Sequence, residues 1–239
     1  MAIDLKIYNL FRNNKKNKKG KLICLEGIDG SGKRTQTLKL EKYLKDKGYN
    51  VKVISFPIYN EPIGQLISDY LTGEFGDIND VPYKLISLAY SADRAAHTKY
   101  IESLINKGYI ILSDRYTYSN IFNAAKLDDI EKRKEYIEWN EKIEFEELGV
   151  YKPDHNFFLY VDPKISIERI KERGKREYQK GKEDIHEKNS NLLIEATKEY
   201  LKLSERDDWT LINQMKNGKQ VSEDDIFEMI KKEIDIILK

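Results

Sequence analysis

The 239-residue sequence has little of several features that mark particular classes of protein. A single cysteine, Cys24, excludes a disulfide within the chain, and no apolar run approaches the ~18 residues that a membrane-spanning helix requires. The formal net charge is only +1, with 42 lysines and arginines against 41 aspartates and glutamates. Such a balance leaves no overall excess of positive charge that would indicate binding of nucleic acid. We therefore expect a cytoplasmic protein whose partners are neither nucleic acids nor membranes.

The first twenty residues differ in composition from the rest of the chain. They lack an apolar core of signal-peptide length. Four of their lysines stand among asparagines: Lys15, Lys16, Lys18 and Lys19. This composition predicts a flexible, solvated extension over residues 1–20, with a targeting or membrane-surface segment as the alternative. Residues 21–239 show no repeat and no linker, so we expect a single domain there.

Short apolar runs alternate with amphipathic stretches along this domain. Strands that are apolar throughout and alternate with helices form a parallel sheet covered on both faces. The pattern therefore predicts a three-layer α/β fold with five parallel strands, in which ligands bind at the carboxyl ends of the strands. The predicted strands are residues 22–25, 51–55, 109–112, 157–161 and 209–212, and the helices between them include 63–71, 82–107 and 129–148.

A glycine-rich turn follows the first predicted strand. Gly27, Gly30 and Gly32 let the backbone curl so that successive N–H groups point at one anion, at the positive end of the next helix. Lys33 adds a full charge where the β- and γ-phosphates of a nucleotide bind. A strand, a glycine loop, a lysine and a helix in that order are typical of a P-loop, which predicts binding of a nucleoside triphosphate with Mg²⁺. The alternative is an ordinary strand-to-helix turn in which the glycines only make room.

The residue after the P-loop lysine departs from the usual pattern. Ser or Thr is expected there because its hydroxyl binds Mg²⁺, but this chain has Arg34, and Thr35 follows one residue late. Either Thr35 holds the metal, or water and phosphate oxygens hold it. We place Asp29, Ser31, Arg34 and Thr35 with the three glycines and Lys33 in the predicted nucleotide-binding loop.

Charged residues also follow the third predicted strand and occupy the long helix. Asp114 can hold Mg²⁺ or its water and Arg115 can clamp a phosphate, the alternative being a surface ion pair at a strand end. Tyr90 and Arg94 are four residues apart and share a helix face, where a ring and a guanidinium can bind a flat base. Core packing of Tyr90 beside a solvated Arg94 is the alternative.

A basic stretch punctuated by glycines lies between two predicted helices. Seven lysines and arginines occur between residues 169 and 182, together with Gly174 and Gly181. This composition favours a lid over about 173–185 that closes on the triphosphate, excludes water and neutralises the charge that moves. Arg173 and Arg176 are the lid residues that we expect to be catalytic. An ordinary solvated charge run is the alternative.

Together these motifs resemble those of thymidylate kinase. They are residues 26–33 with Thr35 and Gln36, Phe56 and Pro57 with Ile63 and Gly64, residues 92–94, residues 114–116 with Ser119, and residues 152–154. The resemblance covers the chain from about Lys21 onward. It implies a nucleoside monophosphate kinase that transfers the γ-phosphate of ATP to dTMP, giving dTDP for dTTP synthesis. It also implies a homodimer built on long helices.

The resemblance further implies a role for individual residues. Asp29 is expected near the deoxyribose 3′-hydroxyl, Tyr90 on the base, and Arg94 and Arg115 on the base and the monophosphate. The other expected substrate contacts are Phe56, Ser119 and Asn123, the last of which lies where many relatives carry an aromatic residue or glutamine. The expected catalytic groups are Lys33, Asp114, Arg173 and Arg176, with Asp114 organising Mg²⁺.

Other functions remain open from the residues alone. A nucleoside monophosphate other than dTMP is one alternative acceptor. A deoxynucleoside kinase would phosphorylate a hydroxyl and would need a carboxylate base directly after the second strand, where the chain has Phe56 and Pro57. A P-loop nucleotide switch would recognise guanine, but the sequence lacks an Asn/Thr-Lys-x-Asp motif. A switch also has no use for Arg94, Arg115 and a basic lid together.

Overall fold

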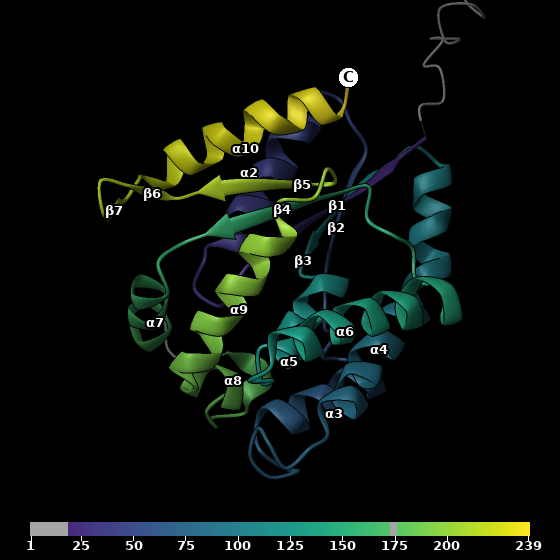
Figure 1. Cartoon of the computed structure of the whole chain (residues 1–239). Coiled ribbons are helices and arrows are strands. Elements are labelled where there is room, and N and C mark those ends of the chain that lie inside the picture. The colour runs from purple at the N-terminus through teal and green to yellow at the C-terminus, as the bar shows by residue number, and fades with distance from the viewer. Residues whose placement is uncertain (1–18, 173–175) are drawn as a thin grey trace, which may run out of the picture.

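The computed structural model describes residues 19–172 and 176–239. Residues 1–18 of the predicted extension, and Arg173 of the predicted lid, lie outside the described residues. The central sheet consists of β1 (Lys21–Glu26), β2 (Val51–Ser55), β3 (Ile110–Asp114), β4 (His155–Tyr160) and β5 (Trp209–Asn213). All neighbouring pairs are parallel, in the order β2-β3-β1-β4-β5 (Figure 1). The predicted α/β fold with five parallel strands is confirmed.

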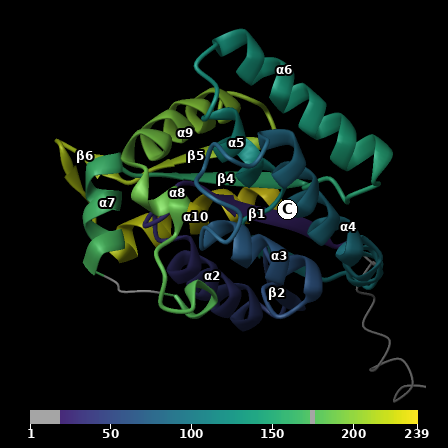
Figure 2. The ribbon, with the colours of Figure 1, turned by 90° about the horizontal axis from the view of Figure 1, so that it is seen from below.

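Helices cover both faces of this sheet. Helices α2 (Lys33–Asp46) and α10 (Glu223–Ile237) lie above it in Figure 1, and α4 (Tyr83–Asn106) and α9 (Ser190–Leu203) lie below. Figure 2 shows the lower face, with α6 at its outer margin. The remaining elements are α3 (Pro62–Leu71), η1 (Thr117–Asn120), α5 (Ile121–Ala124), α6 (Ile130–Glu141), η2 (Lys142–Glu147), α7 (Pro163–Glu172), η3 (Glu177–Gln179), α8 (Ile185–Lys188), β6 (Met215–Lys216) and β7 (Lys219–Gln220).

The side chains of β1 show how the two layers are built. Ile23 and Leu25 belong to the core cluster formed with α2 and α10, whereas Leu22 and Cys24 belong to the cluster formed with α4. All four are fully buried, because β1 is the central strand and both of its faces are covered. The carboxyl ends of the strands point to the left in Figure 1, toward α7 and the β6–β7 hairpin.

Two of the differences between the predicted and the observed elements have an evident physical reason. The predicted helix over 129–148 is α-helical only to Glu141 and continues as the π-helical segment η2, whose wider turn carries Glu144 into the interior. The fourth strand begins two residues earlier than predicted. His155 and Asn156 are polar and give no apolar signal, yet the first is satisfied by a 2.9 Å hydrogen bond with the hydroxyl of Thr210 on β5.

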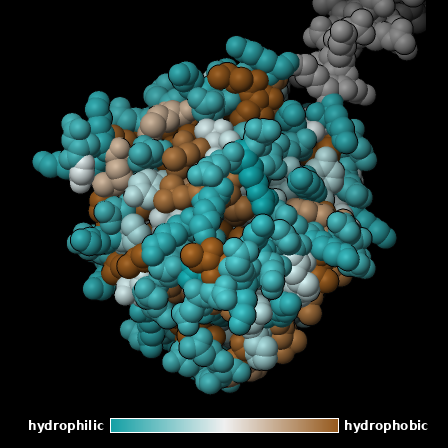
Figure 3. Space-filling view, viewed as in Figure 1, coloured by the Kyte–Doolittle hydropathy of each residue, from teal (hydrophilic) through white to brown (hydrophobic). Residues whose placement is uncertain are grey.

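The outer surface is mainly hydrophilic. Figure 3 shows one face covered by polar and charged residues, with apolar side chains in scattered groups. Among the described residues, none of the helices combines the length and the apolar character needed to cross a membrane.

Gly64 allows α3 to pack closely on the segment that follows β2. A Cβ atom at this position would lie 1.9 Å from the carbonyl oxygen of Ile58, which is backbone and cannot move away alone. Gly64→Ala should therefore lower the free energy of unfolding by roughly 1–3 kcal/mol, as overpacking does elsewhere. Urea unfolding measures the change. Gln65→Ala, on the same helix but partly exposed, is the matched control and should change stability by less than about 0.5 kcal/mol. Equal stabilities for the two variants would contradict the close contact.

Candidate active site

The glycine-rich turn joins β1 to α2 at the carboxyl end of the central strand. Gly30 and Gly32 have φ angles of 78° and 84°, in the left-handed region that glycine adopts without strain. A Cβ atom on Gly30 would lie 2.7 Å from the carbonyl oxygen of Ser166 in α7. The carbonyl of Ser31 accepts a 2.8 Å hydrogen bond from Nε2 of Gln214, and both residues are buried. The turn is thus held between α7 and the segment that follows β5.

Lys33 begins α2 and points back into the turn. Its Nζ donates to the carbonyl oxygens of Gly27 at 2.9 Å and Ile28 at 2.8 Å, and the residue is only 6% exposed. Burial, with a smaller contribution from the Arg115 guanidinium, lowers the pKa of Lys33 to about 7. The loop therefore holds a cation close to its titration point.

Asp29 joins three segments that are far apart in the sequence. Its Oδ1 accepts hydrogen bonds from Nη2 of Arg115 at 2.8 Å and from Nη2 of Arg176 at 3.1 Å. Arg115 follows β3 and also donates to the carbonyl of Gly27 at 3.2 Å, whereas Arg176 precedes η3. The hydroxyl of Ser166 donates to the backbone carbonyl of Asp29. Two of the predicted site arginines thus meet at the P-loop carboxylate.

Glu26 is a buried carboxylate at the end of β1, and the sequence analysis gave it no role of its own. It accepts hydrogen bonds from the backbone N–H of Tyr116 at 2.8 Å, the hydroxyl of Ser119 at 2.7 Å and the hydroxyl of Tyr200 at 3.0 Å. Burial raises its pKa. Two of these contacts fix the segment directly after Arg115. The sequence feature that could have indicated a role for Glu26 is its position as an acidic residue at the end of an otherwise apolar strand.

Arg94 and Tyr90 lie on α4, and the predicted alternative of a solvated Arg94 is wrong. Arg94 is 1% exposed and forms a two-point ion pair with Glu144 of η2, at 2.8 Å from Nε and 2.5 Å from Nη2. Its Nη1 donates to the carbonyl of Tyr116 at 3.3 Å. Tyr90 is half-buried and, like Tyr59, packs against the largest core cluster. Glu144 gave no sequence signal, because it lies 50 residues from its partner.

Phe56 and Asn123 are both buried. Phe56 packs edge-on against Tyr116 and His97, with ring centroids 5.4 and 5.8 Å away, so it belongs to the core beneath α4. Asn123 Nδ2 donates to the hydroxyl oxygen of Ser87 at 3.0 Å. Its Oδ1 has no hydrogen-bond partner among the described residues. Asn123 therefore presents an unused acceptor beside the face of α4 that carries Tyr90 and Arg94.

The residues predicted to hold Mg²⁺ lie at the entrance of the turn. Arg34 and Thr35 are exposed on the first turn of α2, and Asp114 is partly exposed at the end of β3. Within residues 19–172 and 176–239, Asp114 forms no ion pair and no group of three or more acidic, histidine or cysteine side chains could enclose a metal. Mg²⁺ is commonly bound by one or two carboxylates together with substrate phosphates and water. A single free carboxylate near Lys33 fits that donor set.

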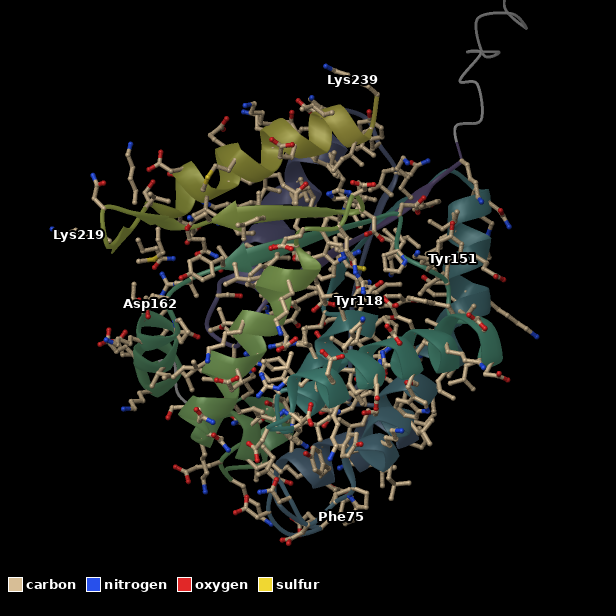
Figure 4. All side chains as sticks on the ribbon, in the orientation of Figure 1. Phe75, Tyr118, Tyr151, Asp162, Lys219 and Lys239 are labelled. Atoms are coloured by element: carbon tan, nitrogen blue, oxygen red, sulfur yellow. The ribbon has the colours of Figure 1, made fainter. Side chains whose placement is uncertain are left out.

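The part of the predicted lid that the structure describes begins at Arg176 and folds over the turn toward α3. The ring of Tyr178 stacks on Tyr59, with centroids 4.2 Å apart and planes inclined by 9°. The carbonyl of Tyr178 accepts a 2.8 Å hydrogen bond from the hydroxyl of Ser68, and its own hydroxyl donates to Asp184 at 2.6 Å. In Figure 4, Asp162 marks the start of α7, on the side of the molecule from which this segment departs. The segment is thus fixed to both the P-loop and α3.

A P-loop at the end of the central strand, with arginines from two other segments on its carboxylate, defines a P-loop phosphotransferase. Comparison with known proteins narrows the class. A sequence model of the family described as thymidylate kinase matches residues 25–226. The thymidylate kinase of Mycobacterium tuberculosis is 31% identical over 185 residues, covering 77% of this chain and 85% of that protein. The chain belongs to the thymidylate kinase family, whose members are ATP-dependent nucleoside monophosphate kinases.

Two further relatives support the assignment. The thymidylate kinase of Caldicellulosiruptor saccharolyticus is 34% identical over 232 residues, which span 92% of this chain and 98% of that protein. A solved structure of thymidylate kinase from Candida albicans superposes with a TM-score of 0.71 at 27% identity, covering 91% of this chain and 92% of that one. The family resemblance predicted from the motifs is confirmed.

The lowered pKa of Lys33 predicts a proton uptake on nucleotide binding. Triphosphate charge beside Nζ raises the pKa above its value of about 7, so from about pH 7 to 9 binding converts neutral Lys33 to the cation. ATP affinity should fall as pH rises through this range, and below about pH 6 no uptake is expected because both states are charged. Calorimetric titration at pH 8 in buffers of different ionisation enthalpy measures the uptake. Lys33→Met should abolish it, and equal uptake by that variant would contradict the assignment.

Proposed function

We propose that this chain transfers the γ-phosphate of ATP to dTMP and so forms dTDP. The observation that carries the proposal is the meeting of Asp29, Arg115 and Arg176 beside the P-loop lysine. This arrangement places two guanidinium groups from different segments next to the expected path of the phosphoryl group. A nucleotide switch gains nothing from such a cluster, whereas phosphoryl transfer between two anions requires it.

The reaction needs positioning and charge neutralisation more than covalent chemistry. The two phosphates must lie in line, and negative charge spreads over the transferring group. Lys33 and the loop N–H groups neutralise charge on the ATP side, and we propose that residues 173–185 act as a lid that brings Arg176, and Arg173, to the same region. Arg115, with Ser119 beside it, holds the acceptor monophosphate. The attacking phosphate oxygen is already anionic, so no protein base is needed.

Mg²⁺ would be held through Asp114 and the nucleotide phosphates. The metal neutralises phosphate charge when bound. Asp114 supplies a carboxylate near Lys33, and the hydroxyl of Thr35 is a further oxygen ligand on the first turn of α2. Arg34 replaces the usual hydroxyl at the preceding position and adds a cation on the side where ATP would enter.

The acceptor base would lie between Tyr90 and Asn123, with Arg94 at its edge and Asp29 near the sugar hydroxyl. An arginine donates to carbonyl oxygens, which thymine presents and adenine replaces in part by an amino group. If an amino group of the base faced Arg94, two hydrogen-bond donors would meet. Both would stay unpaired, at a cost of roughly 1–3 kcal/mol. The Candida albicans enzyme is described as having broad substrate specificity, so the ranking of acceptors has to be measured for this chain.

Assembly stays a prediction from the resemblance, and location stays a prediction from the composition. A homodimer is supported by apolar side chains that α4 leaves exposed, Leu85, Leu88 and Tyr100. Exposed apolar side chains of this kind can be buried when two copies of a chain associate. We propose a cytoplasmic location, where ATP and nucleoside monophosphates are available.

Removing the Lys33 charge tests the P-loop assignment. Lys33→Met should lower kcat by ~10² or more, because the charge acts mainly in the transition state. Lys39→Met is a matched control on the same helix, since Lys39 points outward and pairs with Glu223 and Asp224. Steady-state kinetics with dTMP and ATP, alongside circular dichroism, measures both variants. Activity of Lys33→Met within a few-fold of wild type would rule out the proposed mechanism.

The choice of acceptor tests the function itself. We expect kcat/KM to be highest for dTMP, lower for dUMP and lowest for purine monophosphates, with no ADP released when thymidine is the acceptor. A coupled ADP-release assay across dTMP, dUMP, dCMP, dGMP, dAMP and thymidine gives the ranking. Turnover of thymidine would favour a deoxynucleoside kinase, and a purine as best acceptor would refute this account of base selection.

A further inference from the structure

We propose that Glu144 is a positioning residue for acceptor selection, because it holds the Arg94 guanidinium in the one orientation that leaves donors free for the base. Glu144 itself need not touch the substrate. The inference rests on the proposed function only in placing Arg94 beside the acceptor base.

The carboxylate of Glu144 is saturated by hydrogen bonds from two elements, α4 and η1. It is 0% exposed, and both of its oxygens are shared between Arg94 and other donors. The contacts are Arg94 Nη2 (2.5 Å), Ser91 Oγ (3.0 Å) and Asn120 Nδ2 (3.2 Å) to Oε1, and Arg94 Nε (2.8 Å) and Thr117 Oγ1 (2.7 Å) to Oε2. A carboxylate held at this many points cannot rotate, so its orientation fixes that of the guanidinium.

The π-helical turn of η2 is what brings this carboxylate inward. Residues 142–147 continue α6, but the wider turn interrupts the α-helical spacing at Glu144. Single π-helical turns are uncommon and occur frequently at functional sites. The elements joined by Glu144 are α4 and η1, and η1 begins two residues after Arg115 in the sequence. In Figure 4, Tyr118 of η1 lies inside the molecule beneath the sheet, in the layer where these elements meet. The turn therefore ties the base side of the candidate site to its phosphate side.

The contacts of Arg94 leave donors for a ligand. A guanidinium has five N–H groups, and Nε, Nη1 and Nη2 each make hydrogen bonds within the protein, to Glu144 and to the carbonyl of Tyr116. One N–H on each terminal nitrogen therefore has no hydrogen bond among the described residues. These two N–H groups can donate to a carbonyl oxygen of a base.

Neighbouring negative groups keep the buried Arg94 guanidinium in its charged form. Burial is the largest single effect and opposes the charged form, but the attraction and hydrogen bonds of Glu144, together with the charges of Tyr116 and Glu26, outweigh it and raise the pKa of Arg94. The side chain is consequently a fixed cation. Without Glu144, the guanidinium would lose both its counter-charge and two of its three fixed contacts.

A second buried arginine–glutamate pair provides a control outside the site. Arg133 of α6 donates to Glu199 of α9 at 3.2 Å, and both residues are buried. Glu199→Gln removes a buried carboxylate from an arginine where no substrate is expected, although Glu195 also accepts a 2.6 Å hydrogen bond from Arg133 and Lys202 also pairs with Glu199. A purely structural role of either glutamate should therefore appear in stability, and only Glu144→Gln should change the binding of dTMP.

The decisive measurement compares Glu144→Gln with Glu199→Gln. For Glu144→Gln we expect KM for dTMP to rise about tenfold or more, which corresponds to the loss of one charge-assisted hydrogen bond. KM for ATP should stay within about twofold of wild type, and the preference for dTMP over dGMP should shrink. Glu144→Asp, which keeps the charge on a shorter side chain, should recover part of the loss. Glu199→Gln should lower the melting temperature without changing KM for dTMP or the acceptor ranking.

A double substitution separates positioning from a general structural role. If Glu144 acts through Arg94, then adding Glu144→Gln to Arg94→Met should raise KM for dTMP no further than Arg94→Met alone. The double variant carries no unpaired buried charge, whereas Arg94→Met leaves the buried Glu144 carboxylate without its partner, so the melting temperature of each variant is measured beside KM. If Glu144→Gln fails to fold, Glu144→Asp, which keeps the charge, takes its place. A further increase in the double variant, or an unchanged KM and ranking in folded Glu144→Gln, would overturn the inference. If the wild-type enzyme prefers another monophosphate as acceptor, the proposed function is wrong. The role of Glu144 can still be tested then, because Glu144→Gln should raise KM for that acceptor by the same factor.

Discussion

The arrangement of the candidate site depends on one carboxylate. Asp29 lies in the P-loop, and its Oδ1 accepts hydrogen bonds from two arginines that are 86 and 147 residues away in the sequence. Without that negative charge, Arg115 and Arg176 would repel each other and Lys33 in a poorly hydrated space. The carboxylate therefore permits a density of positive charge that a folded chain does not otherwise tolerate. That charge density is also what stabilises a transferring phosphoryl group.

Buried acidic residues organise the layers beneath this cluster. Glu26 holds the backbone around Arg115 through Tyr116 and Ser119, and Glu144 holds Arg94 between α4 and η2. Both carboxylates are fully buried, and each accepts several hydrogen bonds. Buried charges with incomplete partners are strongly destabilising, so these networks also restrict which substitutions the interior accepts.

The sequence carried enough information for the sheet, most of the helices and the identity of the family. Apolar strands such as 22–25 and the glycine turn before Lys33 are local patterns. Local patterns can be recognised in the sequence without knowledge of the fold. The contacts of the site are not local. Arg94 was expected beside the base or in solvent, but its main partner is Glu144, and only the π-helical turn after α6 brings that carboxylate inward. Phe56 likewise gave no sign that it packs into the core against His97.

The stacking of Tyr178 on Tyr59 has a mechanical consequence. Residues 176–179 are anchored at one end to Asp29, which belongs to the loop of the phosphate donor, and at the other to Tyr59 and Ser68, beside α3. This short segment therefore ties the loop of the phosphate donor to α3, and the distance between these two elements is set by the length of one short stretch of chain.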